Sequence, residues 1–251
     1  MAVYIGSTAG YLRLDSWVLS KIAQLSVNNF CRRYFNRDND PCGRQFDQTV
    51  QAIRAVPANI AEGSARHQTS VETEMRLLDV ARASLSEVVE DLMFVLMDNG
   101  RTVWDDDDTP ARAVRDLRLS PACYGKGLLH DASAHVLEQN RKFEPWVERD
   151  DLMVPAKARI VICQRIIRML RHQIEARLKE FEEQGGFTEN MTDTRLQAKR
   201  QQNEAQQAPR CPKCGAVMVR RMAKKGVNAG HEFWSCSNFS TTGCNGALPI
   251  T

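Results

Sequence analysis

The sequence lacks several features that would assign a class at once. It has no uninterrupted run of the roughly 18 to 20 apolar residues that a membrane-spanning helix needs. Its first residues have neither the basic nor the apolar region of a signal peptide. With only 9 Pro and 14 Gly, it does not fit a collagen-like or low-complexity architecture. We therefore expect a globular cytoplasmic protein with no membrane partner and with reduced thiols.

The net charge is small for the whole chain but not for its parts. The formal net charge is only +3 over 251 residues. Residues 1–154 carry 18 Lys and Arg against 23 Asp and Glu, whereas residues 155–225 carry 16 against 7. A chain polarised in this way favours a polyanionic partner for its positive part.

Most of the chain has the apolar periodicity of helices. Four segments show it: residues 16–34, 46–63, 78–95 and 155–181. Thr69 and Glu72 form a capping box before the third helix, and Gly63 suits the end of the second. Pro155 suits the first turn of the fourth. The pattern predicts an all-α fold, an antiparallel four-helix bundle with a helical insertion.

The expected organisation has five parts. They are helices one to three of the bundle (1–100), an insertion subdomain (101–154), the fourth bundle helix (155–184), a polar Gln-rich linker (185–210) and a small β module (211–251). The insertion contains the acidic run Asp105 to Asp108, for which we favour a solvated loop.

Four of the eight cysteines lie in the last 41 residues. Cys211 and Cys214 form a CxxC turn, Cys236 follows after 21 intervening residues, and Cys244 after seven more. Zinc prefers four thiolates in a tetrahedron, and a CxxC turn supplies two of them from one tight loop. A 40-residue module has too little core to fold alone, so Zn²⁺ would supply the folding free energy.

Residues 216–222 and 231–235 alternate as the strands of a hairpin with a Gly-rich turn between them. Cations and aromatic rings on this module suit the sequence-tolerant binding of a single nucleic-acid strand. The candidate contacts are Lys213, Arg220, Arg221, Lys224, Lys225, Phe233, Trp234 and Phe239. Neighbours on a strand point to opposite faces, so one of Phe233 and Trp234 packs inward, and the sequence leaves open which.

The string from Cys211 to Cys244 resembles the C4 zinc ribbon at the C-terminus of bacterial type I DNA topoisomerases. Its matching parts are Cys-Pro-x-Cys-Gly, a basic hairpin, an aromatic pair, Cys-Ser-Asn-aromatic and a final Cys. In that family the ribbons bind single-stranded DNA. The link Ser240-Thr-Thr-Gly before Cys244 is longer than usual, and the typical Pro is absent. Nothing else resembles the catalytic parts of that enzyme.

Residues 43–92 resemble the four-helix-bundle family encoded by intervening sequences in bacterial 23S rRNA genes, which includes the accessory variability determinant of diversity-generating retroelements. The resemblance rests on Pro57-Ala-Asn-Ile-Ala-Glu-Gly63 and on Ala81-Arg-Ala-Ser-Leu85, where Ala83 replaces the usual Gly. It implies a homo-oligomer, a pentamer in the accessory determinant, and a reverse transcriptase as partner.

The fourth helix carries a basic face that includes Arg159, Arg165, Arg168 and Arg171. A charged helix face is usually just solvated, but this one barely mixes signs. We therefore add Arg165, Arg168 and Arg171 to the candidate phosphate contacts.

No Ser-His-Asp pattern, HExxH motif or phosphate-binding Gly loop is present, so we expect no enzymatic activity. The leading interpretation is a non-enzymatic accessory protein that binds single-stranded DNA or RNA through its ribbon. One alternative is an oligomeric scaffold whose ribbon docks a protein. Another is a metal-dependent nuclease acting at Asp105–Asp108, which the lack of an acid–base constellation disfavours.

Overall fold

The computed structural model describes residues 10–67, 70–185, 191–199, 208–224 and 229–250. The chain forms two compact units, Met1–Phe187 and Thr188–Thr251. The first is helical, and the second contains a small antiparallel sheet. A mostly helical chain with a β module at its C-terminus is what the sequence predicted. Of the helices in the described ranges, none combines the length and apolarity needed to cross a membrane.

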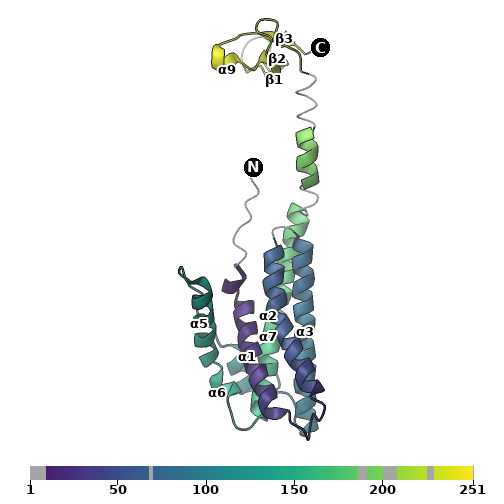
Figure 1. Ribbon diagram of the computed structural model, residues 1–251, viewed down its shortest axis with the longest axis vertical. Helices are drawn as coiled ribbons and strands as arrows, with labels where there is room; N and C mark the ends of the chain where they lie inside the picture. Colours follow the sequence, from purple (N-terminus) through teal and green to yellow (C-terminus); the bar gives the residue numbers. More distant parts are fainter. Residues whose placement is uncertain (1–9, 68–69, 186–190, 200–207, 225–228, 251) are drawn as a thin grey trace. The chain divides into compact units, whose positions relative to one another are not determined.

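Four long helices lie side by side in the first unit (Figure 1). They are α1 (Asp15–Tyr34), α2 (Arg44–Arg66), α3 (Val71–Asp98) and α7 (Met153–Gln184). Helix α3 packs on α2 and α7, and α1 packs on the same two helices. Each contributes to one apolar core, for example through Ile22, Ile53, Leu85 and Ile162. A short 3₁₀ turn, η1 (Gly10–Arg13), precedes α1 and adds Leu12 to this core.

The ends of α2 and α3 differ from the sequence prediction. Helix α2 continues past Gly63. At this glycine α2 packs against α3, where a Cβ would lie at ordinary contact distance, 3.4 Å, from the carbonyl oxygen of Glu74. Helix α3 is capped by Ser70, whose hydroxyl accepts a 3.1 Å hydrogen bond from the amide of Thr73. Thr69, the expected cap, lies outside the described residues.

The insertion packs onto the long helices. It contains α4 (Thr109–Arg115), α5 (Leu128–Arg141) and α6 (Glu144–Val147). Helices α4 and α6 contact α7, and α5 contacts α1. The acidic run before α4 forms a loop closed on itself, since the amide of Asp105 donates to the carboxylate of Asp108 at 2.9 Å. That loop is the solvated connection that the sequence favoured.

The first half of α7 contains a buried arginine. Arg159 was expected on a solvent-facing basic surface, yet it is 1% exposed. Its Nε donates to the carbonyl of Ser26 in α1 at 2.9 Å, and its Nη2 donates to the carbonyl of Val147 in α6 at 3.1 Å. The guanidinium lies 5.1 Å from the ring centroid of Phe30. Burial lowers the pKa of Arg159 to about 10. Arg159 therefore joins three helices.

We predict that Arg159→Ala lowers the free energy of unfolding by about 2–4 kcal/mol, because it opens a cavity and deprives two buried carbonyls of a donor. Arg159→Met fills the same space without a charge and should cost less. Arg171→Ala, an exposed change on the same helix, should cost under about 0.5 kcal/mol. Urea unfolding followed by circular dichroism measures all three. Equal effects of the two alanine changes would contradict the role of Arg159 in joining the three helices.

Candidate metal centre

The second unit is built on three short strands. These are β1 (Met218–Met222), β2 (Glu232–Cys236) and β3 (Ala247–Pro249), antiparallel in that order. The first two form the predicted hairpin, with Arg220 opposite Trp234. The sequence did not predict β3, because three residues carry no readable alternation. A single helical turn, α9 (Phe239–Thr242), lies between β2 and β3. A separate helical segment covers residues 191–199.

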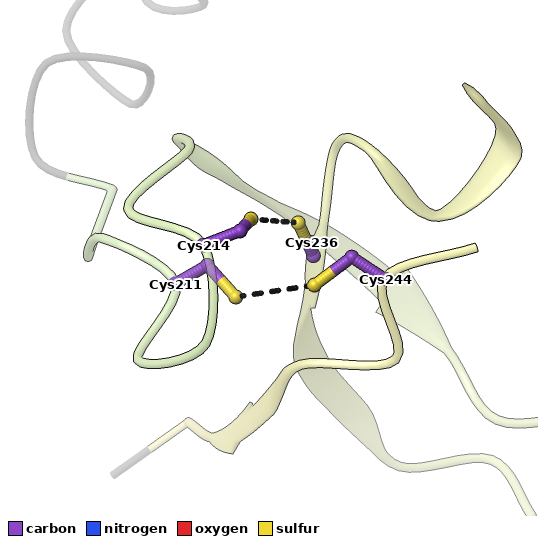
Figure 2. Close-up of side chains that lie close together, drawn as sticks. All are labelled: Cys211, Cys214, Cys236 and Cys244. Atoms are coloured by element: carbon purple, nitrogen blue, oxygen red, sulfur yellow. Dashed lines mark hydrogen bonds between the residues drawn. The ribbon is translucent and has the colours of Figure 1, made fainter. Parts of the chain in front are cut away.

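The sheet and its turns bring Cys211, Cys214, Cys236 and Cys244 together, with their sulfurs directed toward one another (Figure 2). All four Sγ atoms lie within 4.8 Å of one another. The Sγ atoms of Cys211 and Cys244 are 3.8 Å apart, and those of Cys214 and Cys236 are 3.3 Å apart. Four sulfurs at about 2.3 Å from one ion, arranged as a tetrahedron, would be separated by about 3.8 Å. The cluster could therefore hold a metal ion.

The CxxC turn is closed by the backbone. The amide of Gly215 donates to the carbonyl of Cys211 at 2.9 Å, and the amide of Cys211 donates to the carbonyl of Ala216 at 2.8 Å. Gly215 has φ of +73°, a left-handed conformation that glycine adopts without strain. A hydrogen bond from the amide of Lys213 lowers the pKa of the Cys211 thiol to about 7. Such an amide also stabilises a metal-bound thiolate.

The link between Cys236 and Cys244 is longer than the sequence resemblance to zinc ribbons led us to expect. The structure accommodates the added residues as a helical turn. Helix α9 takes up these residues, and Gly243 then reverses the chain with φ of +73°. Two residues after Cys244, the carbonyl of Gly246 accepts the amide of Cys236 at 2.9 Å. A Cβ on Gly246 would overlap the Sγ of Cys211. Sequence analysis missed this glycine, although a Gly close to a ligand is the signal for such an approach.

The apolar core of this unit is very small. Among the described residues, its fully buried members are Cys211, Met218 and Cys236, with Trp234 and Leu248 packed against them. Two of the three are themselves candidate ligands, so little apolar area remains to hold the sheet together. A bound ion would therefore supply most of the stability of this unit.

The register of the sheet divides the candidate aromatic residues between two faces. Trp234 lies on the cysteine face, where it contacts the small core and has Arg220 over its ring at 5.3 Å. Phe233 lies on the opposite face, paired across the strands with Arg221. Both rings are half-buried. Phe239 on α9 is 51% exposed.

The cations of this unit differ in how far they are neutralised. Arg220 lies 3.7 Å from the carboxylate of Glu232, and Lys213 donates to the side chain of Asn245 at 2.7 Å. Arg221 and Lys224 are exposed and form no ion pair with the residues that the structure describes. Lys225, also a predicted contact, lies outside the described residues.

The three candidate arginines on α7 have different surroundings. Arg165 is half-buried, and its Nη1 donates to the carbonyl of Leu117. Burial lowers its pKa. Arg171 is exposed, 3.8 Å from the carboxylate of Glu175. Arg168 is half-buried and has no ion-pair partner among the described residues. The three do not form one open basic stripe.

Comparison with known proteins identifies no relative, because no family model, curated protein or solved structure matches the chain. The two family resemblances read from residues 43–92 and 211–244 therefore stay predictions.

We predict that Gly246→Ala abolishes metal binding, because the added methyl group displaces the Sγ of Cys211. Metal content, measured by plasma mass spectrometry after gel filtration, should fall from about one ion per chain to near zero. Ala247→Ser, an exposed change at the next residue, is the matched control and should retain the ion. If Gly246→Ala retained it as well, this packing around Cys211 would be incorrect.

Removing the ion should unfold the second unit and spare the first. After chelation, or in Cys236→Ser, we expect the amides of β1, β2 and β3 to lose protection in hydrogen–deuterium exchange, while those of α1, α2, α3 and α7 keep it. Cys123→Ser, at an exposed cysteine of the first unit, should behave as the wild type. Unchanged protection of the strands in the chelated protein would show that the sheet does not need a metal.

Proposed function

We propose that this protein is a non-enzymatic nucleic-acid-binding protein in which a zinc ribbon holds a single strand of DNA or RNA. The observation that carries the proposal is the pairing of Arg221 with Phe233 on the sheet face away from the cysteines. A cation that contacts phosphate beside a ring that stacks on a base is the arrangement that sequence-tolerant strand binding requires. Lys224 extends the cationic edge, and exposed Phe239 offers a second ring.

Zinc is the metal that this proposal assigns to Cys211, Cys214, Cys236 and Cys244. Four thiolates in a closed tetrahedral set are typical of structural zinc, which leaves no position for substrate. The ion would fix the two turns and hence the sheet that carries Arg221 and Phe233. Because the thiols must stay reduced to bind it, the proposal places the protein in a reducing compartment such as the cytoplasm.

For the helical unit we propose an antiparallel four-helix bundle that carries the ribbon. Helices α1, α2, α3 and α7 pack in a closed order, each against two others, which supports this class. By the resemblance of residues 43–92, the bundle would assemble as a homo-oligomer, a pentamer in the accessory determinant, and assist a reverse transcriptase. Arg168 and Arg171 would then add phosphate contacts.

A second candidate function is an oligomeric scaffold, and one observation favours it. Phe94 and Met97 are more than half exposed on α3, three residues apart and therefore neighbours on one face of the helix. Apolar side chains gathered on one face mark an interaction surface more often than isolated ones do. In this case the ribbon would dock a protein, and nucleic-acid affinity would be weak and independent of Arg221.

We predict that the metal-loaded full chain binds single-stranded oligonucleotides more tightly than duplex DNA, with affinity that falls steeply as salt rises. Phe233→Ala should cost about 1–3 kcal/mol of binding free energy through lost stacking. Arg221→Gln should weaken binding and flatten the salt dependence. Fluorescence anisotropy with labelled DNA and RNA measures these quantities, and the comparison also shows which of the two is preferred.

Met222→Ala is the matched control for this experiment. Met222 is 61% exposed on β1, next to Arg221 but on the cysteine face of the sheet. Its replacement should leave binding unchanged. Binding that is insensitive to salt, to Arg221→Gln and to Phe233→Ala would reject the ribbon as the nucleic-acid site and favour the scaffold.

A further inference from the structure

A pocket of about 300 Å³ lies between α2 and the segment formed by η1 and the first half of α1. Helix α1 contributes Trp17, Lys21 and Gln24, spaced four and three residues apart on one side of the helix. Helix α2 contributes Arg54 and the small residues Pro57, Ala58 and Ala61. Long side chains on α1 opposite small ones on α2 leave the crevice open. Its volume is at the lower end of the range for small-molecule sites.

The charges in this pocket are of one sign. Lys21 and Arg54 both line it, and none of its described lining residues is acidic. The ammonium of Lys21 donates to the side-chain oxygen of Gln24 at 3.2 Å, and no described carboxylate forms an ion pair with Lys21 or Arg54. Burial lowers the pKa of Lys21, and the charge of Arg54 lowers it further. The half-buried ammonium of Lys21 therefore lies close to the exposed guanidinium of Arg54 without a described counter-charge, and a bound anion would supply one.

The aromatic side chains of the pocket lie beside these cations. The ammonium of Lys21 is 5.9 Å from the ring centroid of Trp17. Tyr11 meets the Trp17 ring edge-on, with centroids 5.4 Å apart and planes inclined by 70°. Trp17 is only 8% exposed, whereas Tyr11 is half-buried and so offers more ring surface to a ligand. A flat ring could pack against Tyr11 while an attached anion reached the two cations.

We propose that this pocket binds a nucleotide, with its phosphate between Lys21 and Arg54 and its base against Tyr11. The site belongs to the helical unit and does not depend on the proposed function of the ribbon. The nucleotide could be free in solution or the 5′-terminal residue of a strand, because both present the same base and phosphate.

The test is calorimetric titration of the full chain with adenosine monophosphate and with inorganic phosphate. The double variant Lys21→Gln/Arg54→Gln should weaken nucleotide binding by about 100-fold, roughly tenfold for each charge-assisted contact. Arg44→Gln, at an exposed arginine of α2 outside the pocket, should leave it unchanged. Tyr11→Ala should weaken the nucleotide but not inorganic phosphate.

The melting temperature of the double variant is measured beside the titrations, and a value equal to that of the wild type shows that binding is lost without loss of the fold. No binding of the nucleotide by the wild type, or equal binding by the double variant, overturns the proposal. Inorganic phosphate binding as tightly as the nucleotide overturns the assignment of Tyr11.

The two sources are separated with 5′-phosphorylated and 5′-hydroxyl oligonucleotides in the Arg221→Gln background, where ribbon binding is already weakened. A preference for the 5′-phosphate that disappears in the double variant supports a strand end as the ligand. Binding of the free nucleotide without that preference supports a free nucleotide. Because the ribbon variants leave this pocket intact, failure of the ribbon proposal and failure of the pocket proposal give different results.

Discussion

The helical unit depends on the burial of the first half of α7. From Ala156 to Leu170 this helix is buried on most of its circumference, and it contacts α1, α3, α4 and α6. A helix that presents apolar residues on most of its sides can be stable only inside a core. The other elements are therefore arranged around it, and the insertion between α3 and α7 covers the part that α1 and α3 leave open. Arg159, within this stretch, ties α6 to α1.

The second unit has too small a core to be stabilised by apolar burial in the way that the helical unit is. Its strands are three to five residues long, and its described core has three fully buried members. Burial of that size does not offset the entropy of ordering the chain. An ion held by the four cysteines would compensate, because it would bond to two turns and to the end of β2. Gly215 and Gly243 adopt the left-handed backbone conformation of the two turns, and Gly246 lets the backbone approach the Sγ of Cys211. The proposed ion would in this way also hold the sheet that presents Arg221 and Phe233.

The sequence predicted those features that repeat and missed those set by a single contact. Apolar periodicity located the four long helices, and cysteine spacing located the cluster, because each signal extends over many residues or over a fixed ligand geometry. Gly63 was misread as a helix end, since a glycine inside a helix and one just past its end look alike in local sequence. Arg159 was expected on a solvated face because a charged residue is usually exposed, and the sequence does not show the two backbone carbonyls that satisfy it inside the core. The period of two gave the opposite faces of Phe233 and Trp234, but only the register showed which ring meets the core.

The distribution of ion pairs refines what net charge suggested about the positive part of the chain. On α7, Arg159 is buried, Arg165 donates to a backbone carbonyl and Arg177 contacts Glu74 at 3.2 Å. Cations engaged in this way must break existing contacts before they can meet phosphate, so they contribute little to counterion release. In the ribbon, Arg221 and Lys224 are exposed without a described acidic partner, and Glu232 is taken by Arg220. Much of the positive charge on α7 is therefore structural, whereas Arg221 and Lys224 of the second unit are available to a ligand. The ribbon (residues 211–251) has fewer cations than α7, but these two are free to meet phosphate. We therefore propose that the ribbon has the leading part in nucleic-acid binding.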